Sequence, residues 1–171
     1  MTISRTTQAH LAKGDFDAIE SEWLGRLGES PDDLDHFVGV ARALVGNGQE
    51  GRARTLLEML DEHLKERELW AVRRKLLERA GTLLLPADKV HPTLLATLKR
   101  LYGHRPSFVG LVEAVGLHRA PQDIPKSWEK VERLETLLAF DIGTVVAMEG
   151  KGVGRVVEAN MGLESFKIDF E

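Results

Sequence analysis

The chain has 171 residues, enough for one ordinary domain or for a helical domain with a small appendage. Its 23 basic and 27 acidic residues argue against a broad nucleic-acid surface, which would show an excess of basic residues. The absence of cysteine excludes a disulfide framework, a thiolate metal site and a cysteine nucleophile. Neither a membrane-spanning run nor the apolar segment of a signal peptide is evident, so we expect a cytoplasmic protein with no membrane contact.

Apolar residues recur at helical spacing from residue 5 to about 138, which predicts a largely helical chain. Short breaks at 13–15 and 46–48 are typical of turns between antiparallel helices. Ser30 is expected to cap a helix that starts at Pro31, with Asp32 and Asp33 near its positive end. Four apolar stripes precede residue 81: Phe16, Ile19, Trp23 and Leu27; Leu34, Phe37, Val38, Ala41, Leu44 and Val45; Ala53, Leu56, Leu57, Leu60 and Leu64; Leu69, Val72, Leu76, Leu77 and Ala80.

The breaks are themselves regularly spaced. Gly14 and Gly48 lie 34 residues apart, and Gly81 follows 33 residues later. A period of 34 with a small residue at the turn between helices resembles tetratricopeptide (TPR) repeats. We therefore expect a TPR-like antiparallel helical solenoid with two recognisable repeats followed by less regular helical pairs.

The second half of the helical region is less regular. A loose stretch from 83 to 89 precedes a helix predicted to start at His91-Pro92, and a further apolar stripe begins at Phe108. Residues 118–125 contain two prolines and no periodicity, which indicates a linker, and Ser127 is expected to cap the last helix. This predicts a helical-repeat domain over 1–125, and a connecting helix with a small β module over 126–171.

At Phe140 the apolar period changes from 3.6 to 2. Strands are predicted at 144–148, 153–159 and 165–170, joined by glycine-containing turns, and together they form an antiparallel meander. The overall class is mainly α with a small β appendage (α+β). Three strands alone are marginal, so the sheet must pack on the helices, pair with a partner, or form part of a small barrel.

The sequence contains no recognisable catalytic or metal-binding constellation. No two histidines have the spacing of ligands on one helix face, and the P-loop and Gly-x-Ser-x-Gly signatures are missing. Gly150, Gly152 and Gly154 precede a strand rather than a helix, so we interpret them as hairpin and bulge residues rather than a phosphate loop. The basic run Arg73, Arg74, Lys75 and Arg79 is expected to be a solvated face, or else a contact for an acidic partner. We expect neither an enzyme nor a cofactor.

The C-terminal part carries the most distinctive motifs. Gly143-Thr-Val-Val is followed by Gly150-Lys-Gly-Val-Gly-Arg and then Phe166-Lys-Ile-Asp-Phe. This order resembles the small polymerase-interacting module of CarD and of transcription-repair coupling factors. With the preceding helical repeats and the Trp128 helix, the chain resembles the N-terminal region of long, helical-repeat-bearing GreA-type transcription elongation factors.

The resemblance implies a contact with RNA polymerase or a transcription-associated protein. The implied partner-binding residues are Lys151, Gly152, Val153, Gly154, Arg155, Phe166 and Ile168. The coiled coil by which Gre factors stimulate transcript cleavage is not in this sequence, so the resemblance implies a piece of a longer factor or a relative without that function. Basic residues are not in excess around these positions, which favours a protein partner over a nucleic acid. The alternative is a TPR-like scaffold that binds a peptide or a protein in its helical groove.

Overall fold

The computed structural model describes residues 3–119, 124–160 and 165–170. The chain forms two compact units, Met1–Val90 and His91–Glu171, and the boundary falls inside a helix. The division predicted after residue 125 is a different one, because it groups the helices between residues 91 and 125 with the N-terminal repeats.

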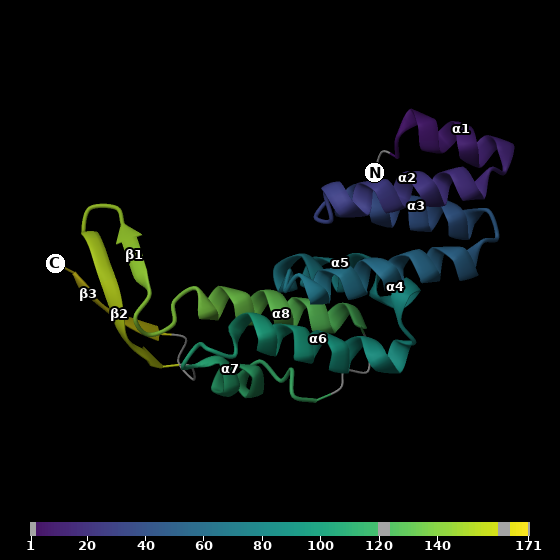
Figure 1. The fold of residues 1–171 in the computed structure, drawn as a ribbon. Helices are drawn as coiled ribbons and strands as arrows, with labels where there is room; N and C mark the ends of the chain where they lie inside the picture. The colour runs from purple at the N-terminus through teal and green to yellow at the C-terminus, as the bar shows by residue number, and fades with distance from the viewer. Residues whose placement is uncertain (1–2, 120–123, 161–164, 171) are drawn as a thin grey trace. The chain divides into compact units, whose positions relative to one another are not determined.

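The described residues form helices followed by one three-stranded antiparallel sheet, so the expected mainly helical class with a small β appendage is confirmed (Figure 1). The helices are α1 (Arg5–Lys13), α2 (Phe16–Glu29), α3 (Leu34–Gly46), α4 (Glu50–Glu66), α5 (Trp70–Leu84), α6 (Ala87–Tyr102), α7 (Phe108–Ala114) and α8 (Ile124–Leu138). The strands are β1 (Val145–Met148), β2 (Gly152–Asn160) and β3 (Ser165–Phe170).

The turns that follow α1 and α3 lie at the glycine-containing breaks that the sequence predicted. Gly14 ends α1 with a φ of 69°, and Gly48 follows α3 with a φ of 73°, a region that glycine enters without steric cost. The cap of α3 differs from the prediction. Asp33 is the N-cap, since its carboxylate accepts a hydrogen bond from the His36 amide at 3.1 Å, whereas Ser30 ends α2.

The third predicted break, at Gly81, is wrong. Gly81 is buried inside α5, where a β-carbon would lie 3.3 Å from Cγ1 of Val90. Its small size therefore serves close packing rather than a turn. Glu68, with a φ of 54°, lies in the turn between α4 and α5, and Leu85 and Pro86 separate α5 from α6.

The core of the first unit is built from the predicted apolar stripes. Helix α3 contacts α1, α4 and α5, which explains why it is buried on almost every side. Trp23 is fully buried, and its ring meets the edge of Phe37 with centroids 4.8 Å apart. Other fully buried side chains include Ile19, Leu44, Leu57, Leu60, Leu64, Leu76 and Leu77.

The basic run on α5 is not one solvated face. Arg73 is buried, and its guanidinium forms two hydrogen bonds with the Asp61 carboxylate of α4, at 2.7 and 3.2 Å. Arg74 pairs with Glu78 one turn later, and Arg79 pairs with Asp35 of α3, which lowers the pKa of that carboxyl. Three of its four residues therefore make contacts within the first unit, whereas Lys75 is exposed.

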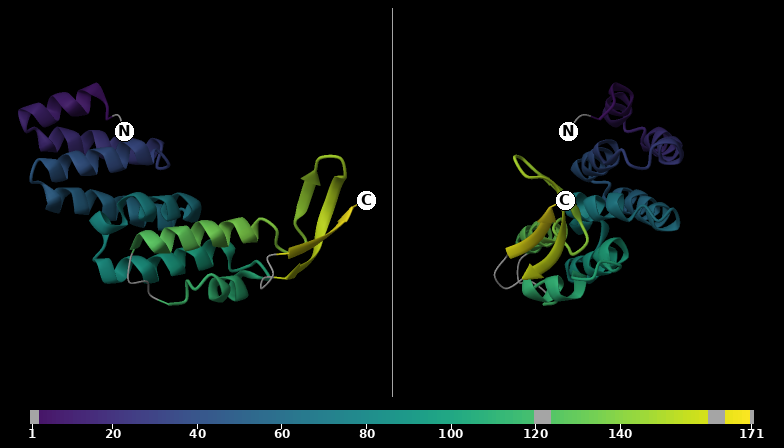
Figure 2. Two further views of the ribbon diagram at one scale, coloured as in Figure 1. Left: turned by 180° about the vertical axis from the view of Figure 1, so that it is seen from behind. Right: turned by 90° about the vertical axis from the view of Figure 1, so that its left-hand side faces the viewer.

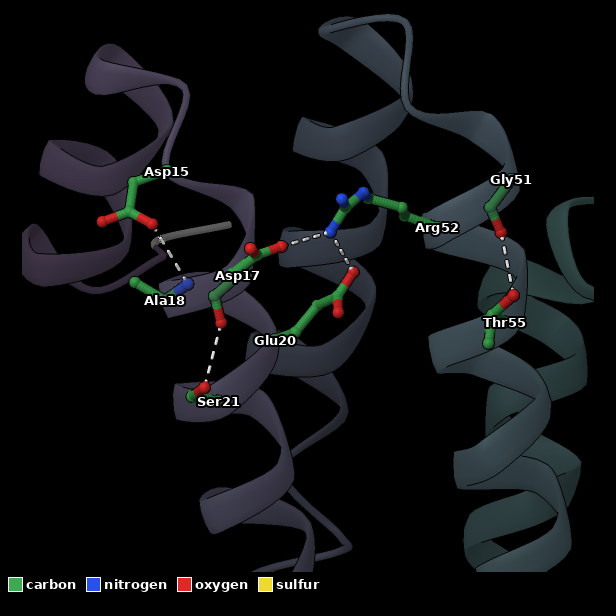
Figure 3. Close-up of polar contacts among 8 residues, drawn as sticks. All are labelled: Asp15, Asp17, Ala18, Glu20, Ser21, Gly51, Arg52 and Thr55. Carbon is green, nitrogen blue, oxygen red and sulfur yellow. Dashed lines mark hydrogen bonds and ion pairs between the residues drawn. The ribbon is translucent and has the colours of Figure 1, made fainter.

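Helices α2 and α4 are joined at their N-terminal ends by Arg52 (Figure 3). Its guanidinium donates to Asp17 at 2.9 Å and to Glu20 at 2.7 Å, and it lies 5.9 Å from the ring centroid of Phe16. These bonds raise the pKa of Arg52. Asp17 and Arg52 are exposed at the side chain and Glu20 is half-buried, so screening by solvent keeps the contribution of these pairs to stability small.

His36 predicts how the stability of the first unit depends on pH. Burial lowers the pKa of His36 from its ordinary value of 6.5, and Arg26 lowers it further, while Glu22 and Asp33 oppose this. Below pH 6.5 the unfolded chain therefore binds a proton at this site more readily than the folded chain. The free energy of unfolding should fall as the pH drops through that range, measured by urea unfolding between about pH 8 and pH 5.

The variant His36→Leu separates the contribution of His36 to the pH dependence from that of other titrating groups. Leucine places an apolar side chain that does not titrate at this buried site. Its free energy of unfolding should decline less between the two pH values than that of the original chain. Parallel pH dependences of the two proteins would show that His36 does not titrate in this way.

The first helix of the second unit starts earlier than predicted. Helix α6 begins at Ala87, directly after Pro86, and continues through Pro92 instead of starting at His91. Proline at this point removes the amide that would donate a hydrogen bond to the Asp88 carbonyl, so α6 continues past residue 92 at the cost of that bond. The loose stretch predicted at 83–89 is accordingly reduced to Leu85 and Pro86.

Helices α6, α7 and α8 enclose the core of the second unit, and α6 and α8 lie side by side (Figures 1 and 2). Helix α8 begins at Ile124, so Ser127 is not its cap; its buried hydroxyl has no hydrogen-bond partner among the described residues. The predicted linker over 118–125 falls in part outside the described residues. The core contains Leu94, Leu98, Phe108, Leu111, Val115, Leu117, Val131, Leu134, Leu137 and Leu138.

Candidate functional site

The β1–β2 hairpin forms where glycines allow a tight turn. Gly150 and Gly152 have φ values of 78° and 87°, and the Lys151 amide donates to the Met148 carbonyl at 3.1 Å. The pairing runs antiparallel from Val145 opposite Arg155 to Met148 opposite Gly152. Both glycines therefore have the hairpin role that the sequence predicted.

Gly154 has a different role from its neighbours. It lies within β2 opposite Phe170, and a β-carbon there would lie 2.7 Å from the Asp169 carbonyl oxygen and 2.7 Å from Cγ2 of Ile168. This position needs glycine because β3 approaches so closely. The bulge expected among these glycines lies further along, between Val156 and Glu158.

The bulge changes which side chains face outward. Val157 is the extra residue, and beyond it Glu158 pairs with Lys167 and Ala159 pairs with Phe166. Ala159 is therefore half-buried with Phe166, while Val157 and Glu158 are both exposed. One inserted residue thus adds an exposed valine to the outer surface of the sheet.

The inner face of the sheet is attached to the helices of the second unit. Phe166 packs against their core and stacks on Phe140, with ring centroids 5.1 Å apart. At the end of α8, Asp141 is fully buried, and its carboxylate accepts hydrogen bonds from the amides of Ile142 at 2.8 Å and Ser107 at 3.5 Å. The first of the three alternatives for this small sheet, packing on the helices, is therefore the one observed.

The outer face of the sheet is exposed and carries both valines and charged side chains. Val145, Val153 and Val157 are 58%, 57% and 43% exposed, and they line a shallow hollow of about 300 Å³ together with Arg155 and Asp169. Among the described residues the strand order is β1-β2-β3, so β1 and β3 each have a neighbouring strand on one side only. This arrangement can accept apolar side chains on its face or a further strand at its edge.

The residues expected to bind a partner are divided between the two faces. Val153 and Arg155 lie on the outer face, and Gly152 lies at the exposed end of the hairpin. Lys151 is exposed, but its ammonium lies 5.8 Å from the ring centroid of Phe170. Gly154 is buried, and Phe166 and Ile168 are half-buried on the inner face.

Sequence reasoning missed two residues of this surface, Val145 and Val157. The alternation in β1 could have placed Val145 opposite Arg155 and hence on the outer face. Val157 could not have been assigned to the outer face, because its exposure depends on the β-bulge, and no residue near it in the sequence indicates a bulge at this position. The outer face therefore combines predicted and unpredicted valines.

Comparisons with protein-family models, with curated proteins and with solved structures found no match. Within the described ranges, no group of three or more histidine, cysteine, aspartate or glutamate residues is placed to hold a metal ion. No helix in the part of the chain that the structure describes is long and apolar enough to cross a membrane.

Proposed function

We propose that this chain is a non-catalytic, cytoplasmic interaction module of a transcription elongation factor. It docks on RNA polymerase, or on a protein associated with it, through the β module. The observation that carries this proposal is the exposure of three valines, Val145, Val153 and Val157, on the outer face of the sheet. The motifs of the β module also resemble those of CarD and of GreA-type factors.

The surroundings of this face favour a protein partner. Arg155 and Lys167 are accompanied by Asp169 and Glu158 on the same strands, so the surface has no basic excess that would attract a phosphate backbone. Exposed valines next to a free strand edge suit contact with another sheet or an added strand. Arg155 lies between Val153 and Val157 on β2 and opposite Asp169 of β3, so charges of both signs are interspersed with the valines.

The helical part is proposed to be a TPR-like solenoid. Helix α4 begins 34 residues after α2, from Phe16 to Glu50, and α3 contacts both α1 and α5. Contacts between alternate helices are what a stack of helical pairs requires. They also favour the alternative function, a scaffold that binds a peptide in its helical groove.

The test is a pull-down of purified RNA polymerase with the full chain and with Val153→Glu. A carboxylate on the outer face should abolish retention of polymerase, because it would be desolvated in the contact without a partner. Val153 is exposed, so the helical content measured by circular dichroism should not change. Phe166 is a poor target for this purpose, since a charge there would disrupt the packing of the sheet on the helices.

Val109→Glu is the matched control. Val109 is a 69% exposed valine on α7, so the substitution makes the same change of side chain away from the sheet. The control should retain polymerase. Equal retention by Val153→Glu would contradict docking through the outer face, and failure of the unchanged chain to retain polymerase would contradict the choice of partner.

A further inference from the structure

A second surface with a distinct chemistry lies in the first unit, between α2 and α4. It is a groove of about 420 Å³ bounded by Leu27 near the end of α2 and by one face of α4. Residues 55, 58, 59, 62, 63 and 66 of α4 line it, at the helical spacing of a single stripe. The buried stripe of α4, which includes Leu57, Leu60 and Leu64, is a different one. Helix α4 thus carries one stripe for the core and another that lines the groove.

The floor of the groove is formed by two apolar residues, Leu27, which is 8% exposed, and the more accessible Met59. Met59 is 41% exposed in the middle of the stripe, and methionine adapts its shape readily to a partner. His63 also lines the groove, and its buried Nε2 atom has no hydrogen-bond partner among the residues that the structure describes. An occupant could thus bury apolar surface on Met59.

The rim of the groove is acidic and regular. Glu58, Glu62 and Glu66 recur every four residues along α4, about 6 Å apart on one face of the helix. The Lys65 ammonium forms an ion pair with the Glu62 carboxylate at 2.7 Å. It also pairs with the buried Asp61 at 2.9 Å, so it neutralises the charge of the rim only in part. Glu58 and Glu66 form no ion pair within the described residues, so their charge is available to a partner.

We propose that this groove binds a basic amphipathic helix of a partner protein. Apolar residues of that helix would lie on Met59 and Leu27, and lysine or arginine residues four positions apart would face Glu58, Glu62 and Glu66. The match follows from geometry, since the cations of a second helix repeat at the same interval as the carboxylates of α4. A nucleic acid or an anionic membrane does not fit, because its phosphates would meet the carboxylates. This surface is independent of the sheet proposed to contact polymerase.

Methyl NMR of the full chain tests the proposal directly. The probe is a synthetic amphipathic peptide of about 18 residues with a leucine stripe flanked by lysines, long enough to fold on contact. The Met59 methyl resonance, assigned through Met59→Leu, should shift saturably, and binding should weaken as salt is raised. Met148, 42% exposed on β1, lies in the other unit and should not shift.

Charge reversal separates the groove from unspecific attraction. Glu58→Lys combined with Glu66→Lys should weaken binding of the peptide by at least about tenfold. Glu132→Lys changes an exposed glutamate of α8 in the other unit and should leave the affinity within about twofold. The same peptide with glutamate in place of lysine should not bind.

Three results would overturn the proposal: an unmoved Met59 resonance at saturating peptide, a shift of Met148 alone, or equal weakening by the α8 control. None of these bears on polymerase binding, which is measured separately on the sheet variants. A failure of one proposal is therefore distinguishable from a failure of the other.

Discussion

Replacing Asp61 by alanine is expected to lower the free energy of unfolding by about 3–5 kcal/mol, the cost of breaking a buried ion pair by removing one partner. Asp61 and Arg73 are each 7% exposed at the side chain, and the guanidinium grips the carboxylate through Nε at 2.7 Å. Without Asp61, the Arg73 guanidinium remains buried but no longer has the carboxylate to which it donates two hydrogen bonds. The change is measured by urea unfolding of the full chain.

The surroundings of the pair increase the expected loss. Lys65 also donates to Asp61, at 2.9 Å. Partial burial works against the charge of Lys65, but hydrogen bonds with Glu62 and Asp61 outweigh it, so the pKa of Lys65 is raised. Removing Asp61 therefore takes away an acceptor that Arg73 and Lys65 share.

Two variants test whether the loss of stability in Asp61→Ala comes from leaving the Arg73 charge buried without the Asp61 carboxylate. The double replacement Asp61→Leu with Arg73→Met should recover much of the stability, because both charges are then exchanged for apolar groups of similar size. Asp17→Ala, which removes an exposed acceptor of Arg52, should have little effect (Figure 3). A double variant as unstable as Asp61→Ala would contradict this account, as would a large loss from Asp17→Ala.

Gly154→Val is expected to unfold the sheet while the helices remain. A β-carbon at this position would lie 2.7 Å from a backbone oxygen of β3 and 2.8 Å from the ring of Phe170, and backbone cannot yield as a flexible side chain can. Overpacking of this kind costs about 1–3 kcal/mol or more, which is large for a sheet of three strands. Amide hydrogen exchange should show lost protection in β2 and β3, with protection kept in α6 and α8.

Gly25→Ala is the control for glycine replacement in general. Gly25 lies in α2, where an added β-carbon would meet nothing within 4 Å. This variant should raise the free energy of unfolding by about 0.5–1 kcal/mol, because alanine loses less backbone entropy in a helix. Unchanged exchange protection in the strands of Gly154→Val would show that β3 can move away at little cost.

The helices and strands could be predicted because their signals are local. The stripe from Ala53 to Leu64 defines α4, and the alternation at Phe166, Ile168 and Phe170 defines β3, since each pattern follows from the geometry of one element. Helix ends were less certain. Ser30, Asp32 and Asp33 compete for one cap, and Asp33 is selected because its carboxylate reaches the His36 amide.

Local sequence patterns were enough to predict most helices and all three strands, the turns at Gly14, Gly48 and Gly150, and the small antiparallel sheet to which the valine-rich hairpin belongs. The packing of the helices was needed to show that Arg73 is buried against Asp61, that Gly81 packs against Val90, and that Glu58 and Glu66 border a groove. The difference comes from the distance along the chain over which each interaction acts. Backbone preference and periodicity act within one element, whereas burial, pairing and exposure depend on which elements meet across many residues of chain.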